Sequence, residues 1–144
     1  HGNMSINMEK SRGFLRSRGL RETRARVAIL GIFLSAPSPV SVPDVLVVLS
    51  ESGQTFNKTT LYRELEFLMA EGIVSLALAL GSCQYYELSR EHHHHLVCTS
   101  CGDIQDIEAR EDLCRFEHEL WHERGFRVAR HSMEFFGVCR KCVA

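Results

Sequence analysis

The feature that most constrains this chain is a run of four histidines, His92 to His95, which leads directly into a Cys-x-x-Cys pair at Cys98 and Cys101. A second such pair, Cys139 and Cys142, stands near the end of the sequence. Together the pairs supply four thiolates, the ligand set of a tetrahedral structural zinc site. Because 37 residues separate the two pairs, we expect the zinc to join distant strands of one domain. Disulfides are the alternative, and they are disfavoured because nothing in the sequence indicates export.

The histidine run predicts two separate metal sites if it forms a β-strand. Successive side chains of a strand point to opposite faces, so His93 and His95 would share one face and His92 and His94 the other. One alternative is an engineered tag, although a tag is usually terminal and longer. The other is a solvated run that binds metals only adventitiously. The adjoining thiolates favour the functional interpretation.

Charge is distributed unevenly along the chain of 144 residues, although the formal net charge is only −1. Residues 1–90 carry 10 basic and 8 acidic side chains, whereas residues 91–144 carry 7 and 10, with seven of the eight histidines. The basic residues concentrate between Glu9 and Arg26. This pattern predicts a nucleic-acid-binding half followed by a sensing half, with a solvated helix face as the alternative for the basic segment.

The sequence gives no sign of a membrane partner. No apolar run approaches the roughly 20 residues that a membrane span needs, and no signal peptide is visible. We therefore expect a cytoplasmic protein. Residues 1–7, in which His1-Gly2-Asn3 precedes Met4, are interpreted as a tag remnant or a flexible start.

Helix signals fill the first part of the chain. A short basic helix is expected over residues 8–18, and N-caps are predicted for the next two helices at Thr23 and Ser41. The fourth helix is expected to open at residues 57–60. The second helix carries apolar residues at helical spacing and is expected to end at residues 36–39. In the fourth helix, one buried stripe is predicted from the spacing of Leu61, Leu65, Leu68 and Met69.

Alternating apolar residues then predict a β-hairpin over residues 73–80 and 83–88. Helices followed by a hairpin form the plan of a winged helix-turn-helix domain, whose recognition helix places its N-terminal residues in the DNA major groove. We therefore expect the exposed start of the fourth helix to contact DNA, with basic side chains of the first helix on phosphates. The candidate DNA-binding residues are Arg16, Arg18, Lys58, Thr59, Thr60, Tyr62 and Arg63.

The second part of the chain predicts a small α/β domain, so the whole chain is of the α+β class. Short strands are expected on both sides of Gly102, and a helix over residues 111–123 has one apolar stripe. A long strand carrying His131 is expected over residues 126–138. The short strands span 94–98 and 104–107, and the stripe comprises Leu113, Phe116, Leu120 and Trp121.

These pieces together resemble the ferric uptake regulator (Fur) family over nearly all of residues 8–142. The resemblance implies a winged-helix DNA-binding domain over residues 1–90 and a metal-binding dimerisation domain with structural zinc over residues 91–144. It implies a homodimer that binds double-stranded operator DNA in response to metal and represses metal-homeostasis or stress genes. The matching segments are residues 19–26, 59–63, 92–101 and 131–139.

The resemblance also implies three metal sites, and two of them divide the histidine run as strand alternation does. The structural zinc site matches Cys98, Cys101, Cys139 and Cys142. An interdomain regulatory site matches Glu87, His93 and His95. A site within the dimerisation domain matches His92, His94 and His131, with Cys114 as a further ligand.

Several positions depart from the family pattern, so the sensed metal stays open. Pro39 and Ser75 stand where relatives place a first-domain ligand, which leaves water or Cys83 to complete the regulatory site. A thiolate from Cys114 with three imidazoles would suit zinc, whereas the carboxylate of Glu87 favours a harder metal. Besides the structural Zn²⁺, the expected regulatory cofactor is therefore Fe²⁺ or Zn²⁺, with Mn²⁺ as a further candidate.

We expect a transcriptional repressor and not an enzyme. A peroxide-sensing or other-metal-sensing member of the family is the nearest alternative, and a zinc-storage protein is a second. A zinc hydrolase or deaminase would need three protein ligands, an open coordination position and a carboxylate base, for which Glu91 or Glu108 are candidates. This third alternative is disfavoured because we expect no H-x-E or H-E-x-x-H element in the chain.

Overall fold

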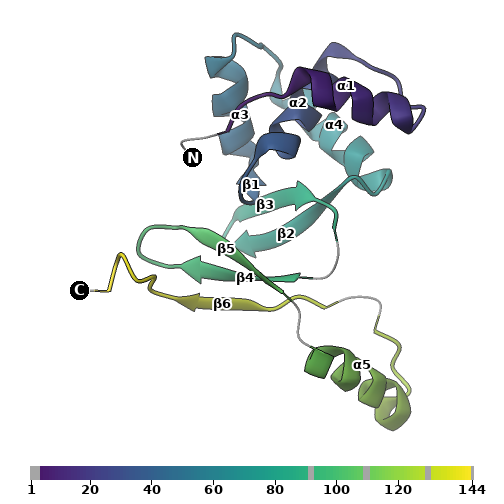
Figure 1. Ribbon diagram of the computed structural model, residues 1–144, viewed down its shortest axis with the longest axis vertical. Helices are drawn as coiled ribbons and strands as arrows, with labels where there is room; N and C mark the ends of the chain where they lie inside the picture. The colour runs from purple at the N-terminus through teal and green to yellow at the C-terminus, as the bar shows by residue number, and fades with distance from the viewer. Residues whose placement is uncertain (1–3, 91–92, 109–110, 129–130, 144) are drawn as a thin grey trace. The chain divides into compact units, whose positions relative to one another are not determined.

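The computed structural model describes residues 4–90, 93–108, 111–128 and 131–143. The chain divides into two compact units between Ser89 and Arg90, and each is described by itself (Figure 1). Within the described ranges, no helix is long and apolar enough to cross a membrane. The first unit contains α1 (Met8–Ser17), α2 (Arg24–Ser35), β1 (Val40–Ser41), α3 (Val42–Glu51), α4 (Lys58–Ala70), β2 (Val74–Leu80) and β3 (Cys83–Leu88). The second contains β4 (His93–Cys98), β5 (Ile104–Glu108), α5 (Glu111–Arg124) and β6 (Glu134–Gly137).

Side-chain caps begin the helices of the first unit where the sequence predicts them. The Thr23 hydroxyl accepts a hydrogen bond from the Arg26 backbone N–H at 3.2 Å, and Asn57 caps α4 in the same way. At α3, the side chains of Ser41 and Asp44 each accept from the other's backbone N–H, forming a capping box. The N-caps predicted at Thr23 and Ser41 are therefore confirmed, and the fourth helix opens at Asn57 as expected.

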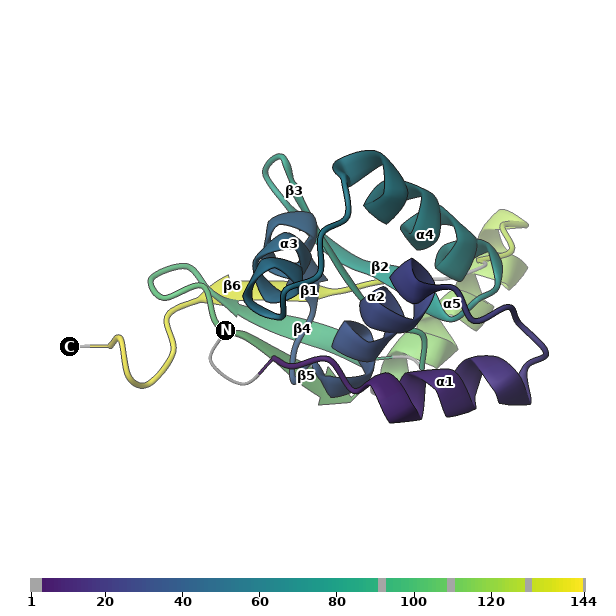
Figure 2. The ribbon, with the colours of Figure 1, turned by 90° about the horizontal axis from the view of Figure 1, so that it is seen from above.

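Helix α2 forms the centre of the first unit and is buried on all sides from Val27 to Phe33. Helices α1, α3 and α4 surround it in the view of Figure 2. A helix that is apolar all round belongs in a protein core. At Gly31, an added Cβ would lie 2.9 Å from a side-chain atom of Ile6, so this glycine lets the segment before α1 cross closely over α2.

Helix α4 buries a narrower stripe than the sequence predicts. Leu61, Leu65 and Leu68 are fully or almost fully buried, whereas Met69 is 41% exposed. Residue 69 is rotated about 80° from residue 61 around the helix, which places it at the edge of the stripe. On the opposite edge the buried side chain is Glu64.

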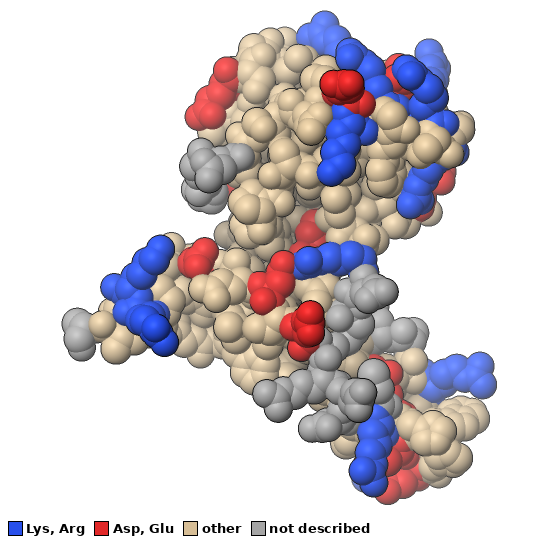
Figure 3. Space-filling view, in the orientation of Figure 1, with Lys and Arg blue, Asp and Glu red and all other residues tan. Residues whose placement is uncertain are grey.

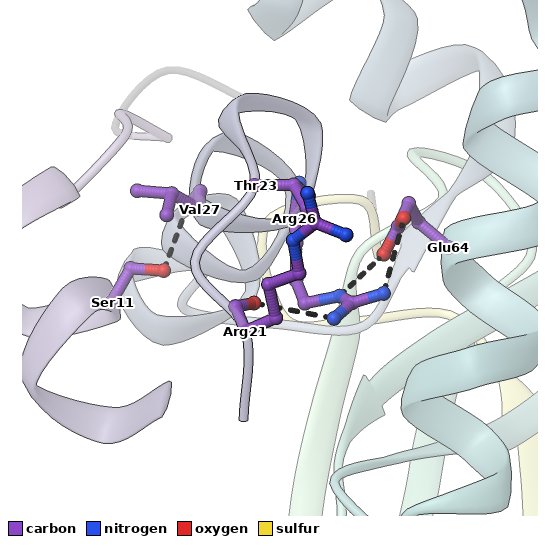
Figure 4. A network of polar contacts seen from close by, with 6 residues as sticks. All are labelled: Ser11, Arg21, Thr23, Arg26, Val27 and Glu64. Carbon is purple, nitrogen blue, oxygen red and sulfur yellow. Dashed lines mark hydrogen bonds and ion pairs between the residues drawn. The ribbon is translucent and has the colours of Figure 1, made fainter. Parts of the chain in front are cut away.

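Glu64 is buried because it forms an ion pair with Arg26 of α2 (Figure 4). The Arg26 Nε atom lies 2.9 Å from a Glu64 carboxylate oxygen, and the guanidinium carbon lies 3.6 Å from the centre of the Phe67 ring. A second guanidinium nitrogen donates to the Arg21 carbonyl at 3.2 Å. These contacts fix α4 against α2 and the loop before it.

The strands of the first unit form an antiparallel sheet in the order β1-β3-β2. The β2–β3 pairing runs from Val74 opposite Leu88 to Leu80 opposite Cys83, with an irregularity between Leu76 and Leu78. This bulge interrupts the regular alternation that the sequence predicts. Four helices followed by this hairpin make the first unit a winged helix-turn-helix domain.

The second unit is built around β4, which lies between β5 and β6 in a three-stranded sheet. Strands β4 and β5 form an antiparallel hairpin, and β6 pairs with β4 in parallel. The predicted long strand over residues 126–138 is wrong, because β6 extends only over Glu134–Gly137. The parallel pairing begins at His95 opposite Glu134, so the described residues before Met133 have no strand register with β4.

Helix α5 does not bury its predicted stripe within the chain. Phe116 and Trp121 are 56% and 45% exposed, although the helix itself forms as predicted. The unit is therefore a small α/β domain with an open apolar surface.

Removing the charge of Glu64 tests the link between α2 and α4. Glu64→Gln should lower the free energy of unfolding of the first unit by about 2 kcal/mol, because it leaves the Arg26 guanidinium with little solvent and no counter-charge. The matched control is Glu22→Gln, which removes an ion pair to Arg16 whose arginine is 70% exposed and should cost less than about 0.5 kcal/mol. Urea unfolding followed by circular dichroism measures both, and equal losses would contradict this role for Glu64.

Candidate metal centres and DNA-binding surface

The four cysteines of the two Cys-x-x-Cys pairs come together in the second unit. Their Sγ atoms all lie within 4.8 Å of one another, and the Cys139 sulfur is 3.8 Å from Cys101 and 3.6 Å from Cys142. Ligands 2.3 Å from a zinc ion in tetrahedral geometry are about 3.8 Å apart. The donor set and its spacing therefore fit a structural zinc ion, and no described cysteine forms a disulfide.

The pairing of β4 with β6 brings these cysteines together. Cys98 lies opposite Gly137 in the parallel register, so Cys139 follows two residues beyond the end of that pairing. The backbone N–H groups of Cys101 and Cys139 donate to the Cys98 sulfur at 3.4 and 3.3 Å. These two hydrogen bonds lower the pKa of Cys98 to about 6.

The Cys142 thiol is held in its protonated form by its neighbour in the cluster. A side-chain hydrogen bond with the Cys139 sulfur raises the pKa of Cys142 to about 12, because the bond stabilises the neutral thiol. A divalent cation among the sulfurs would displace this proton and favour four thiolates. The cluster thus has the electrostatics expected of a metal site.

Two histidines and one aspartate form a second group on the β4–β5 hairpin. The ligand atoms of His93, His95 and Asp106 lie within 4.8 Å of one another, and the two imidazole centres are 4.8 Å apart. His95 is directly opposite Asp106 in the hairpin register, with its Nε2 atom 3.4 Å from the carboxylate. Asp106 also contacts Arg90.

Asp106 was not predicted from the sequence. The predicted hairpin could have revealed it, because counting outward from the turn at Gly102 places residue 106 opposite residue 95. Glu87, the carboxylate that the sequence analysis assigned to this site, lies on β3 of the first unit. Its participation stays a prediction.

A third group contains the remaining described histidine of the run. His94 is 2% exposed, its ring centre lies 5.2 Å from that of His131, and its Nδ1 atom accepts a hydrogen bond from the Met133 backbone N–H at 3.1 Å. His131 contacts the Glu117 carboxylate of α5. Glu117, which follows Cys114 by three residues in the chain, was not predicted from the sequence.

The other two ligands predicted for this third group, His92 and the side chain of Cys114, lie outside the described part of the structure. The described members are therefore two imidazoles and one carboxylate.

One histidine pair was overlooked in the sequence. Residues 118–122 read His-Glu-Leu-Trp-His, which is an H-E-x-x-H element on α5. The Nε2 atoms of His118 and His122 are 3.0 Å apart. The expectation that the chain contains no H-E-x-x-H element is therefore wrong.

The residues predicted to contact DNA lie on α1, just after it, and on the first turns of α4. Tyr62 is 49% exposed, and Lys58, Thr59 and Arg63 are exposed beside it. Thr60 is half-buried, and its backbone N–H donates to the Asn57 side chain at 2.8 Å. Arg16 pairs with Glu22, and Arg18 lies over the Phe14 ring. Lys and Arg side chains gather over this part of the first unit (Figure 3).

A winged helix-turn-helix domain joined to a domain with a Cys₄ cluster and histidine–carboxylate groups defines a class of metal-binding transcription regulators. Within that class, the model of the "Ferric uptake regulator family" matches residues 17–136. The chain therefore belongs to the ferric uptake regulator family.

Known proteins similar to this chain include regulators and solved structures of the family. The peroxide-responsive repressor PerR of Staphylococcus aureus (strain Mu50) is 30% identical over 135 residues, covering 94% of this chain and 90% of that protein. The ferric uptake regulator of Francisella tularensis, solved with iron, superposes with a TM-score of 0.73 at 27% identity over 86% of this chain and 95% of that one. The corresponding protein of Pseudomonas aeruginosa, solved with manganese, gives 0.67 at 30% identity over 90% and 98%.

Replacing one thiolate of the Cys₄ cluster tests its role. Cys142→Ser should lose one tightly bound zinc per chain and unfold or monomerise the second unit, since structural zinc contributes on the order of 10 kcal/mol to the folding of small domains. The control is Lys141→Ala, which changes an exposed side chain beside Cys142 and keeps all four thiolates. Zinc content and thermal unfolding measure the effect, and a stable Cys142→Ser protein with unchanged zinc would refute the assignment.

Proposed function

We propose that this regulator is a metal-dependent repressor of metal-homeostasis genes that acts in the cytoplasm as a homodimer, and that His93, His95 and Asp106 hold the sensed metal. The convergence of two imidazoles and a carboxylate on one hairpin carries the proposal. The Nε2 atom of His93 and the Nδ1 atom of His95 are buried, so the group has a largely desolvated side suited to a cation.

The donor set favours iron over zinc as the sensed metal. Two histidines and one carboxylate are typical ligands of Fe²⁺, while manganese accepts the same oxygen and nitrogen donors. The similar regulators of F. tularensis and P. aeruginosa were solved with iron and manganese. Zinc stays the competing candidate because imidazole also suits it.

Glu87 is the proposed fourth ligand. It belongs to the first unit, whereas the other three belong to the second, so a shared cation would link the DNA-binding unit to the dimerisation unit. Such a link regulates DNA binding only if the metal binds more tightly to the DNA-competent conformation than to the other.

The homodimer is supported by the apolar surface of the second unit. Large apolar side chains are exposed on β6 and just after it, and others are exposed on α5; exposed apolar surface of this kind is typical of an interaction site. A second copy of the chain would cover such surfaces in a symmetric, isologous contact. The exposed residues are Phe116, Trp121, Phe135, Phe136 and Val138.

DNA recognition is assigned to the first turns of α4. Tyr62 offers an aromatic ring for apolar contact with a thymine methyl and a hydroxyl for the backbone, and Arg63 offers a forked donor for a base edge or phosphate. Arg16, Arg18 and Lys58 would neutralise phosphates. In a dimer, two copies of α4 would address two half-sites of a pseudo-palindromic operator.

A peroxide-responsive repressor is the second candidate. It is favoured by the similarity to PerR and by the same two-histidine, one-carboxylate group, because that ligand set leaves coordination positions open on Fe²⁺. In this alternative the protein is still a repressor, but it responds to peroxide and not to the concentration of the metal.

Substitutions on α4 test DNA recognition, with an operator selected from randomised double-stranded DNA by the metal-loaded protein. Tyr62→Ala and Arg63→Ala should each weaken operator binding by about 1–3 kcal/mol. Lys58→Ala should weaken binding to all sequences and flatten the salt dependence by about 0.9 in log–log slope. Met69→Ala, exposed at the far end of the same helix, is the control and should bind as the parent does. Parental affinity in Tyr62→Ala would exclude α4 as the reading helix.

Substitutions at the two histidine groups test which one senses metal. His93→Ala and Asp106→Asn should abolish metal-activated operator binding and leave the stability of the second unit nearly unchanged. His131→Ala should lose a different metal equivalent with a milder effect on DNA affinity. Operator binding and metal content are measured with iron, manganese, nickel and zinc at buffered concentrations. Full metal activation of His93→Ala together with its loss in Cys114→Ser would move the sensing role to the His94–His131 group.

The same titration distinguishes the second candidate. Hydrogen peroxide should release DNA from the iron-loaded protein and not from the manganese-loaded protein if the chain is peroxide-responsive. Retention of DNA in both forms would leave the metal-responsive repressor.

A further inference from the structure

Helix α5 carries a histidine pair that none of the three metal groups uses. His118 and His122 are four residues apart and therefore on one face of the helix. Both side chains are exposed, their ring centres are 4.5 Å apart, and their Nε2 atoms approach to 3.0 Å. Two histidines with this spacing on a helix can chelate one metal ion.

We propose that His118 and His122 form an additional, surface-exposed binding site for a borderline divalent cation, with Ni²⁺ or Cu²⁺ as the favoured class. Two nitrogens each about 2.1 Å from one ion are about 3.0 Å apart at a right angle and about 3.4 Å apart at the tetrahedral angle. The observed 3.0 Å matches the right angle of square-planar or octahedral coordination, which Ni²⁺ and Cu²⁺ adopt.

The position of the pair on the helix also favours a cation. His122 lies in the last turn of α5, where the carbonyl groups at the C-terminal end of the helix carry partial negative charge. A bound metal would take the place of the contact between the two Nε2 atoms and would be stabilised by the partial negative charge of these carbonyl groups. The site is independent of the proposed regulatory function.

Binding, and not hydrolysis, is the chemistry that these residues support. In a zinc hydrolase with the H-E-x-x-H element, the glutamate serves as general base and a third protein ligand completes the site. Here Glu119 pairs with Arg115 at 3.5 Å. Among the described residues, no further His, Cys, Asp or Glu ligand atom gathers with the pair, so water would fill the other positions.

The single tryptophan of the chain, Trp121, lies three residues after His118 and directly before His122, and it provides the readout. The zinc-loaded full chain is titrated with Ni²⁺, which quenches nearby indole fluorescence without oxidising thiols. We expect saturable quenching with one additional Ni²⁺ per chain. His118→Gln and His122→Gln should each raise the midpoint at least about tenfold, since even the loss of an outer-shell partner commonly costs that much.

Two controls separate this site from the rest of the molecule. Glu119→Gln keeps both imidazoles and should titrate as the parent does. His131→Ala, which alters the nearby third group, should keep the quenching at its parental midpoint. Helical content measured by circular dichroism verifies that each variant is folded. A parental midpoint in His118→Gln and His122→Gln, or loss of the quenching in His131→Ala, would overturn the proposal.

Discussion

The placement of β4 between two partners is the constraint on which the second unit depends. Its antiparallel register with β5 sets His95 against Asp106. Its parallel register with β6 sets Cys98 against Gly137. Backbone hydrogen bonds therefore decide which side chains from three separate segments meet, and the candidate metal ligands gather as a consequence of that pairing. A shift of one residue in either register would turn every candidate ligand of that strand to the opposite face.

In the first unit the corresponding role belongs to the buried contacts around α2. This helix has no polar face, so it packs against α1, α3 and α4 alike. The Arg26–Glu64 ion pair makes that packing more specific, because it connects one position of α2 to one position of α4. The orientation of α4 is thereby fixed relative to α2. A rigid support of this kind is what a DNA-reading element requires.

Local signals were predicted well from the sequence, and long-range pairings were predicted only in part. The caps at Thr23 and Ser41 depend on neighbours within three residues and were found. The Cys₄ cluster was also found, because two Cys-x-x-Cys pairs carry their chemistry in their spacing. Asp106 was missed because an aspartate on a strand has no distinctive local pattern, and its partner is fixed only by the hairpin register.

Other errors have the same origin. The length of β6 is set by how many of its residues pair with β4. The composition of residues 126–138 does not encode that pairing. Met69 fits an apolar spacing but lies at the edge of the α4 stripe, where Glu64 takes the buried position on the other side because Arg26 is there to neutralise it. The exposure of Phe116 reflects a surface that one copy of the chain leaves open.

The alternation of ligands along β4 has a consequence for how this protein can change over evolutionary time. Because neighbouring residues of one strand serve different groups, an insertion or deletion within the strand would disrupt both groups at once. Donors on other elements, such as Asp106 on β5 and Glu117 on α5, can be exchanged one at a time without disturbing that alternation. Metal preference in such a chain is therefore free to drift by substitution on the surrounding elements, while the length of the central strand is held constant.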